Sequence, residues 1–197
     1  GTTDARNPVM ELDSGGNPIV VWRENGGSTL DTYVWRWTGS TWEALGSALS
    51  AYPGDTSVQD GAIAIDPSGN PIVAWSESGP NGFVVHVRRW TGSSWEVLGG
   101  PLPNSQNSYH TEGLSLKLTA QGAPLVAWVE WYPSPEREEV KLHMWRLVQD
   151  SWTHMLTLGY EDPSGPVLAL DANDVPTLAW SETNGPGRSV FVIRQNR

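Results

Sequence analysis

Four glutamates recur at one place in a repeated pattern, and their regular spacing suggests shared chemistry. Each follows a tryptophan by two residues, so the two side chains lie on the same face of an extended strand. Four carboxylates arranged in a ring could bind a structural cation through oxygen ligands. The alternative is a repeated hydrogen bond to loop backbone, or an ion pair with an arginine, because repeats duplicate structural contacts before functional ones. The glutamates are Glu24, Glu77, Glu130 and Glu182.

A second set of candidates consists of aromatic and polar residues at positions where the repeats differ from one another. A residue that one repeat alone carries is not needed to build the repeat. Exposed aromatic side chains beside polar groups suit sugar or peptide binding, although such loop residues can also fold back onto the sheets. The candidates are Trp131, Tyr132, Glu138 and Glu139 in one enlarged loop, and Tyr52, Tyr109, His110 and Tyr160 in the connections between repeats.

Signatures of catalysis are weak in the linear sequence. The chain has no cysteine, and the four histidines show no metal-ligand spacing. No nucleophile elbow or phosphate-binding glycine loop is present. Two of the histidines, His86 and His143, fall where other repeats carry different residues and are expected at the surface. A pair of carboxylates for glycoside hydrolysis stays open, because only geometry identifies such a pair.

The elements that carry these residues come from a repeat that runs along the whole chain. Its anchoring tryptophans, Trp22, Trp75, Trp128 and Trp180, are 53, 53 and 52 residues apart. A period near 50 with strand-like contents is typical of a β-propeller. In the second copy the expected strands are 62–65, 72–75, 83–90 and 95–98, and the residues from Asp66 to Gly69 have the composition of a type I turn. A tryptophan at the same place in every blade most simply packs a shared core.

The repeats predict an all-β fold, a small propeller of four blades in a single domain over residues 1–197. The repeat has four strands and a period of about 53 residues, and the blades cover about 6–50, 60–103, 112–159 and, incompletely, 165–197. The last blade lacks the outer strand that carries Trp-x-x-Leu-Gly in the first two. We therefore expect a protein partner or a second copy of the chain at the open edge of blade four.

Composition narrows the classes of partner. A net charge of −10 over 197 residues argues against nucleic acid, which requires basic patches. The longest apolar runs are far shorter than the roughly 20 residues that span a bilayer. We expect an extracytoplasmic protein whose signal peptide has been removed.

The pattern Gly-Asn-Pro-x-Val-Ala-Trp, followed by Arg-Trp-Thr-Gly-x-x-Trp-Glu-x-Leu-Gly, resembles repeats of bacterial secreted and cell-surface β-propeller proteins. The Asp-to-Gly turns are loosely similar to those of sialidase-like propellers, and four blades in about two hundred residues is the size of a hemopexin-like domain. The resemblance implies a propeller and lends no support to catalysis.

The function expected from the sequence is therefore a non-catalytic binding or scaffold module that mediates protein–protein attachment, with no cofactor. A lectin-like carbohydrate-binding propeller is the second reading, and a glycoside hydrolase or lyase is the third. On the first two readings the protein is not an enzyme.

Overall fold

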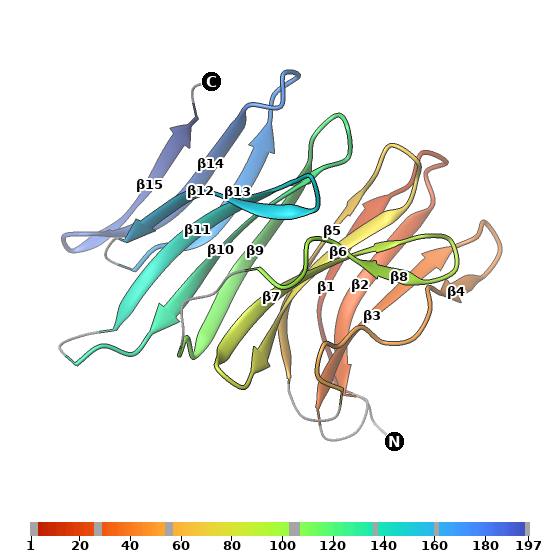
Figure 1. Cartoon of the computed structure of the whole chain (residues 1–197), viewed down its shortest axis with the longest axis horizontal. Helices are drawn as coiled ribbons and strands as arrows, with labels where there is room; N and C mark the ends of the chain where they lie inside the picture. Colours follow the sequence, from red (N-terminus) through yellow and green to blue (C-terminus); the bar gives the residue numbers. More distant parts are fainter. Residues whose placement is uncertain are drawn as a thin grey trace.

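The structure is a computed structural model that describes residues 4–25, 29–53, 57–102, 107–135, 138–159 and 162–195. All of its regular elements are strands, arranged in four antiparallel sheets that we call blades 1 to 4 (Figure 1). None of the described segments forms a helix long and apolar enough to cross a membrane. The predicted all-β propeller with four blades is confirmed.

Each blade is a meander in which consecutive strands pair with each other. Blade 1 contains β1 (Ala5–Leu12), β2 (Pro18–Asn25), β3 (Leu30–Trp37) and β4 (Trp42–Ala44). Blade 2 contains β5 (Val58–Ile65), β6 (Pro71–Gly79), β7 (Gly82–Trp90) and β8 (Trp95–Val97). Blade 3 contains β9 (His110–Leu118), β10 (Pro124–Tyr132), β11 (Glu139–Val148) and β12 (Ser151–Gly159). Blade 4 contains β13 (Ser164–Leu170), β14 (Pro176–Asn184) and β15 (Gly187–Arg194), so its described part lacks a fourth strand, as predicted.

In blades 1, 2 and 4 the turn between the first two strands is built by an aspartate side chain, and in blade 3 by the Thr119 hydroxyl, which accepts a hydrogen bond from the Ala123 N–H at 2.9 Å. In blade 2, Asp66 Oδ1 accepts hydrogen bonds from the backbone N–H groups of Ser68 (2.9 Å) and Asn70 (2.8 Å). The Gly69 N–H donates to the Asp66 carbonyl at 2.9 Å, and Gly69 has a φ of 84° that a side chain would disfavour. Asp13 and Asp171 make the same pair of side-chain contacts in blades 1 and 4.

The core lies between blades rather than inside them. Three clusters of buried apolar side chains fill the seams between blades 1 and 2, blades 2 and 3, and blades 3 and 4. The second strand of each inner blade is buried on both faces, and Trp75 and Trp128 are among its fully buried residues. The expectation that the repeated tryptophans pack a core is confirmed for these two and for Trp180.

An aromatic ring from the third strand stacks on each anchoring tryptophan. Tyr33 lies 5.9 Å from Trp22 and Phe191 lies 5.9 Å from Trp180, between ring centroids. The histidines take this position in the inner blades, His86 at 5.4 Å from Trp75 and His143 at 5.2 Å from Trp128. The expectation that His86 and His143 lie at the surface is wrong, because each is the cross-strand partner of a core tryptophan.

The two ends of the row of blades are open. Figure 1 shows blades 1 and 4 at opposite ends of the molecule, with one chain terminus near each. The side chains that fill a seam elsewhere are exposed at these ends. Met10 in blade 1 is 59% exposed, whereas Ile63 at the same repeat position in blade 2 is 6% exposed. In blade 4, Val190 is 76% exposed, whereas its blade 2 equivalent Val85 is 1% exposed.

Candidate functional site

The first strand of every blade carries a β-bulge at the same repeat position. The register shifts lie between Arg6 and Val9, between Val58 and Gly61, and at the corresponding places in β9 and β13. Bulges are common next to active sites, because they redirect a side chain out of the regular alternation. These first strands lie next to one another, β1 beside β5, β5 beside β9 and β9 beside β13. The bulges therefore bring one irregular position of each blade into a shared region.

Two carboxylates occupy this region, one from each inner blade. Asp60 lies in the bulge of β5, and its Oδ2 accepts a hydrogen bond from the Gly113 N–H in the bulge of β9 at 2.7 Å. The Asn7 amide of blade 1 donates to Asp60 Oδ1 at 3.5 Å. Gly113 has a φ of 67°, and a Cβ there would lie 2.6 Å from Pro166, so the contact between these strands requires glycine. Asp60 is thereby held by the blade on either side.

Glu112, the residue before Gly113, is the second carboxylate. Burial is the main cause that raises the pKa of Glu112 above its ordinary value, and the negative charges of Asp60 and Asp162 add to it. His110 and Arg188 act in the opposite direction. The His110 Nε2 atom lies 3.9 Å from Glu112 Oε2, and Arg188 is bound to Asp162 at 2.7 Å. The environment of Glu112 therefore favours its protonated form more than water does, so its pKa is raised.

An open cavity of about 490 Å³ lies over these groups. Its walls are formed by residues at the N-terminal ends of the first strands of blades 2, 3 and 4 and by one arginine of blade 1. Polar groups from four blades therefore converge on one hollow. The lining residues are Arg23, Gln59, Asp60, His110, Thr111, Glu112, Gly113, Ser164 and Gly165.

Arg23 supplies a positive charge to the wall of this cavity. It projects from β2, and its NH1 donates to the Val58 carbonyl of blade 2 at 3.3 Å. Its Nε is buried and has no hydrogen-bond partner within the described part of the chain. A buried guanidinium donor of this kind calls for an acceptor that the described residues do not supply.

The structure brings some of the predicted site residues together at the edge of this cavity. His110 lines the cavity, and its ring packs against Trp131 with 4.8 Å between centroids. Tyr109, next to His110, is exposed and interacts with the side chain of Glu138. His110 begins β9 and Tyr109 precedes it, Trp131 belongs to β10, and Glu138 directly precedes β11.

The other predicted site residues lie elsewhere. Tyr132 is buried, and its hydroxyl contacts Glu130 at 2.6 Å and His143 at 2.8 Å. Glu139 is exposed and pairs with Lys141 at 3.0 Å. Tyr52 packs edge-on against His86 in blade 2, and Tyr160 lies outside the described residues.

The four repeated glutamates each contact a donor from the protein. The indole N–H of the preceding tryptophan donates to Glu24 at 2.7 Å, to Glu77 at 2.9 Å and to Glu182 at 3.0 Å. Glu77 also accepts hydrogen bonds from the backbone N–H groups of Ala51 and Tyr52. Within the described ranges, no group of three or more His, Cys, Asp or Glu side chains has a metal-binding arrangement.

Sequence reasoning missed Asp60 and Glu112, although a signal for them exists. Both break the repeat. The positions equivalent to Asp60 are Asn7, Gly113 and Gly165, and those equivalent to Glu112 are Arg6, Gln59 and Ser164. Both lie in strands and neither is aromatic, whereas the candidates singled out from the sequence for differing between repeats are aromatic or belong to the expected loops.

The sequence matches no protein-family model and no curated protein. Solved structures show similarity of fold. The chain is similar to an endo-arabinase from Bacteroides thetaiotaomicron VPI-5482, with a TM-score of 0.57 and 13% identity over 96% of this chain and 74% of that one. It is similar to a protein of unknown function from Dyadobacter fermentans DSM 18053, with a TM-score of 0.68 and 14% identity over 98% of this chain and 66% of that one.

A third similar structure is an α-L-arabinanase from Penicillium chrysogenum complexed with arabinobiose, with a TM-score of 0.57 and 11% identity. The match covers 96% of this chain and 62% of that enzyme, so the chain spans less than two thirds of the arabinanase. These matches support a propeller fold and give no support to the sialidase-like or hemopexin-like family suggested by the turns and the size.

The matches also correct the function expected from the sequence. The expectation of a non-catalytic module for protein attachment, and of a protein that is not an enzyme, is contradicted by a fold shared with glycoside hydrolases. Asp60 and Glu112, the two acidic residues that line the cavity, are 52 residues apart and belong to no local motif, so the linear sequence does not relate them. They meet only because adjacent first strands place their bulges side by side.

Proposed function

We propose that this chain is a glycoside hydrolase, with Glu112 as general acid and Asp60 as the second carboxylate. Cleavage of a glycosidic bond needs one protonated carboxyl group to donate to the leaving oxygen and one carboxylate to act as base or nucleophile. Glu112 meets the first need, because burial and neighbouring negative charge raise its pKa. Asp60, positioned by the Gly113 amide, meets the second.

The observation that carries this proposal is the convergence of the two carboxylates on one open cavity at the bulges of adjacent first strands. Arg23 and His110 line the same cavity and suit hydrogen bonding to sugar hydroxyls. The ring of Trp131, packed on His110, offers an apolar surface at the rim of the kind that sugars stack on.

The substrate class we propose is a polymer of α-L-arabinofuranosyl units, supported by the names of the similar enzymes. The open cavity suits a chain that passes across it better than a small molecule enclosed on all sides. A location outside the cytoplasm, where such polymers occur, fits this proposal.

The test is release of reducing sugar from linear arabinan by the purified chain. Glu112→Gln and Asp60→Asn should each lower kcat about 100-fold or more, because each removes one of the two carboxyl groups that the reaction needs. Activity of the unchanged protein should fall as pH rises through the raised pKa of Glu112, since the ionised carboxylate cannot donate a proton.

Glu43→Gln serves as the matched control, because Glu43 is an exposed acid of β4 that pairs with Arg36, far from the cavity. Its activity should equal that of the unchanged protein. Absence of turnover on arabinan and on other plant polysaccharides would contradict the proposal, as would full activity in Glu112→Gln.

A further inference from the structure

We propose that the outer edge of β15 is a binding site for an added β-strand that carries the pattern Trp-Glu-x-Leu. This pattern occurs in the fourth strands of blades 1 and 2, where it reads Trp42 to Leu45 and Trp95 to Leu98. The site lies on a different blade edge from the cavity described above, and the inference does not depend on the proposed enzyme activity.

The free edge of β15 corresponds to the edge of the third strand that binds the fourth strand in blades 1 and 2. There the Leu45 N–H donates to the Val34 carbonyl at 2.9 Å, and the Leu98 N–H donates to the Val87 carbonyl at 3.0 Å. Val192 is the equivalent residue of blade 4, twelve residues after the anchoring tryptophan as in blades 1 and 2. Within the described chain, β15 pairs with β14 on one side only, and Val192 is 65% exposed.

Charge at the edge favours a glutamate on the added strand. In blade 1, Arg36 of the third strand pairs with Glu43 of the fourth at 3.4 Å, and in blade 2 Arg89 pairs with Glu96 in the same way. Arg194 holds this position in blade 4 and pairs instead with Asp171 of the nearby turn. An incoming glutamate would therefore meet an arginine at the register that blades 1 and 2 already use.

The tryptophan of the pattern also has a receiving position. Trp95 of blade 2 donates its indole N–H to the Leu45 carbonyl of blade 1 at 2.6 Å. Counted from the tryptophan, Met155 of blade 3 corresponds to Leu45, since each lies three residues after it. Met155 lies at a bulge where the pairing of β11 with β12 shifts register. In blade 4 the Gln195 side chain donates to the Met155 carbonyl at 3.2 Å, so a protein amide holds the acceptor that the indole would use.

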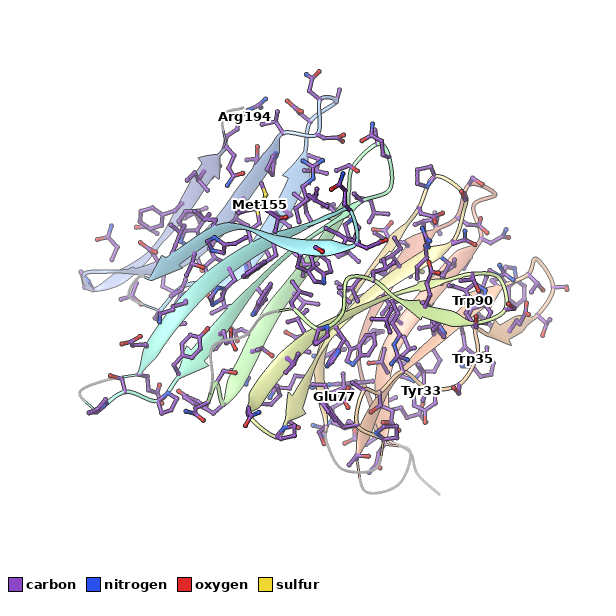
Figure 2. All side chains as sticks on the ribbon, in the orientation of Figure 1. Tyr33, Trp35, Glu77, Trp90, Met155 and Arg194 are labelled. Atoms are coloured by element: carbon purple, nitrogen blue, oxygen red, sulfur yellow. The ribbon has the colours of Figure 1, made fainter. Side chains whose placement is uncertain are left out.

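A cavity of about 230 Å³ lies at this point of the seam between blades 3 and 4. Figure 2 shows the labelled Met155 and Arg194 on these two neighbouring blades. The cavity is where the indole of an added strand would lie. It is lined by Arg146, Met155, Asn173, Asp174, Val175, Pro176 and Gln195.

We therefore infer that the edge binds a β-strand in one defined register. Its tryptophan would lie opposite Gln195 and its glutamate opposite Arg194, and its leucine N–H would donate to the Val192 carbonyl. Strand addition of this type gains affinity from main-chain hydrogen bonds and specificity from alternate side chains.

The probe is a fluorescein-labelled peptide of residues 91–100, which contains the fourth strand of blade 2. We expect saturable binding to the full chain by fluorescence anisotropy. Arg194→Glu should weaken binding tenfold or more, and a peptide with Glu96→Arg should restore it. Lys117→Glu, the same charge reversal at an exposed residue of β9, is the matched control and should leave binding unchanged.

A second measurement covers the case in which the free peptide binds too weakly. Joining residues 91–100 to the end of the chain should raise Tm by about 4 °C or more relative to a fusion with the same residues in scrambled order. No binding in solution together with no rise in Tm would overturn the proposal. A stable dimer of the unmodified chain, seen by light scattering and not dissociated by the peptide, would assign the edge to a second copy and would also overturn it.

Discussion

At the scale of single residues, the ring that stacks on each anchoring tryptophan makes the stability of the folded protein depend on pH. Tyr33, His86, His143 and Phe191 occupy one repeat position, so the fold accepts a phenol, an imidazole or a phenyl ring there. The two imidazoles differ from the other rings in that they can take up a proton. Burial lowers the pKa of both His86 and His143 to about 4.

The lowered pKa values make the folded protein less stable at acidic pH. An unfolded chain protonates each histidine near pH 6.5, whereas the folded chain protonates it near pH 4. The unfolded state therefore binds more protons between these values. The stability that the neutral rings provide is present above about pH 6.5 and is lost as pH falls toward 4.

His86→Phe should reduce this loss without harming the fold at neutral pH. Phe191 already fills the equivalent place in blade 4, and the Nε2 of His86 is buried without a hydrogen-bond partner in the described residues. The variant should take up about one proton fewer on unfolding near pH 5, measured from the pH dependence of the free energy of unfolding. Tyr33→Phe changes the same position in blade 1 without removing a histidine, and it should keep the full pH dependence. An unchanged proton uptake in His86→Phe would contradict the assignment.

At this scale the sequence predicts what local geometry determines. The aspartate turns follow from residue type and spacing alone, because Asp66 contacts backbone only two and four residues away. The stacking of His86 on Trp75 could not be predicted, because it depends on the register between the second and third strands. The same limit applies to Asp60 and Glu112, which meet across a boundary between blades.

At the scale of elements, the fourth strand joins neighbouring blades. The structure shows that its tryptophan reaches the preceding blade, where Trp95 donates to Leu45 at 2.6 Å and Trp152 donates to Gly100 at 3.1 Å. Periodicity along one sheet cannot reveal a contact whose partner is on the next sheet.

Trp95→Phe should therefore weaken the seam between blades 1 and 2. The loss leaves the Leu45 carbonyl without its donor and should lower the free energy of unfolding by about 1–3 kcal/mol, measured by urea denaturation. Trp42→Phe is the matched control. Trp42 packs on Trp37 as Trp95 packs on Trp90, but Trp42 is more exposed and belongs to the first blade of the described chain. Trp42→Phe should lower the free energy of unfolding by less than about 0.5 kcal/mol. Equal decreases for the two variants would argue against the seam contact.

At the scale of the whole molecule, the period of the repeat was sufficient to predict the architecture and the short fourth blade. It was insufficient to predict how the ends are arranged. That arrangement depends on the rotation between adjacent sheets, which is set by the side chains that pack in the three seams. Met10 and Val190 show that the two ends are open, because they are exposed at repeat positions that are buried in the seams elsewhere, and no neighbouring blade of the described chain covers them.

The open row of blades, with a terminus near each end (Figure 1), determines how the molecule should respond to mechanical force. A pull applied to the two termini loads the three seams in series, because blades 1 and 4 of the described chain lie at opposite ends of the row. Blades should detach one at a time, each releasing about 50 residues or roughly 17 nm of chain. An optical trap would record these as separate steps in extension, and a single rupture of the full chain length would show that the blades share the load.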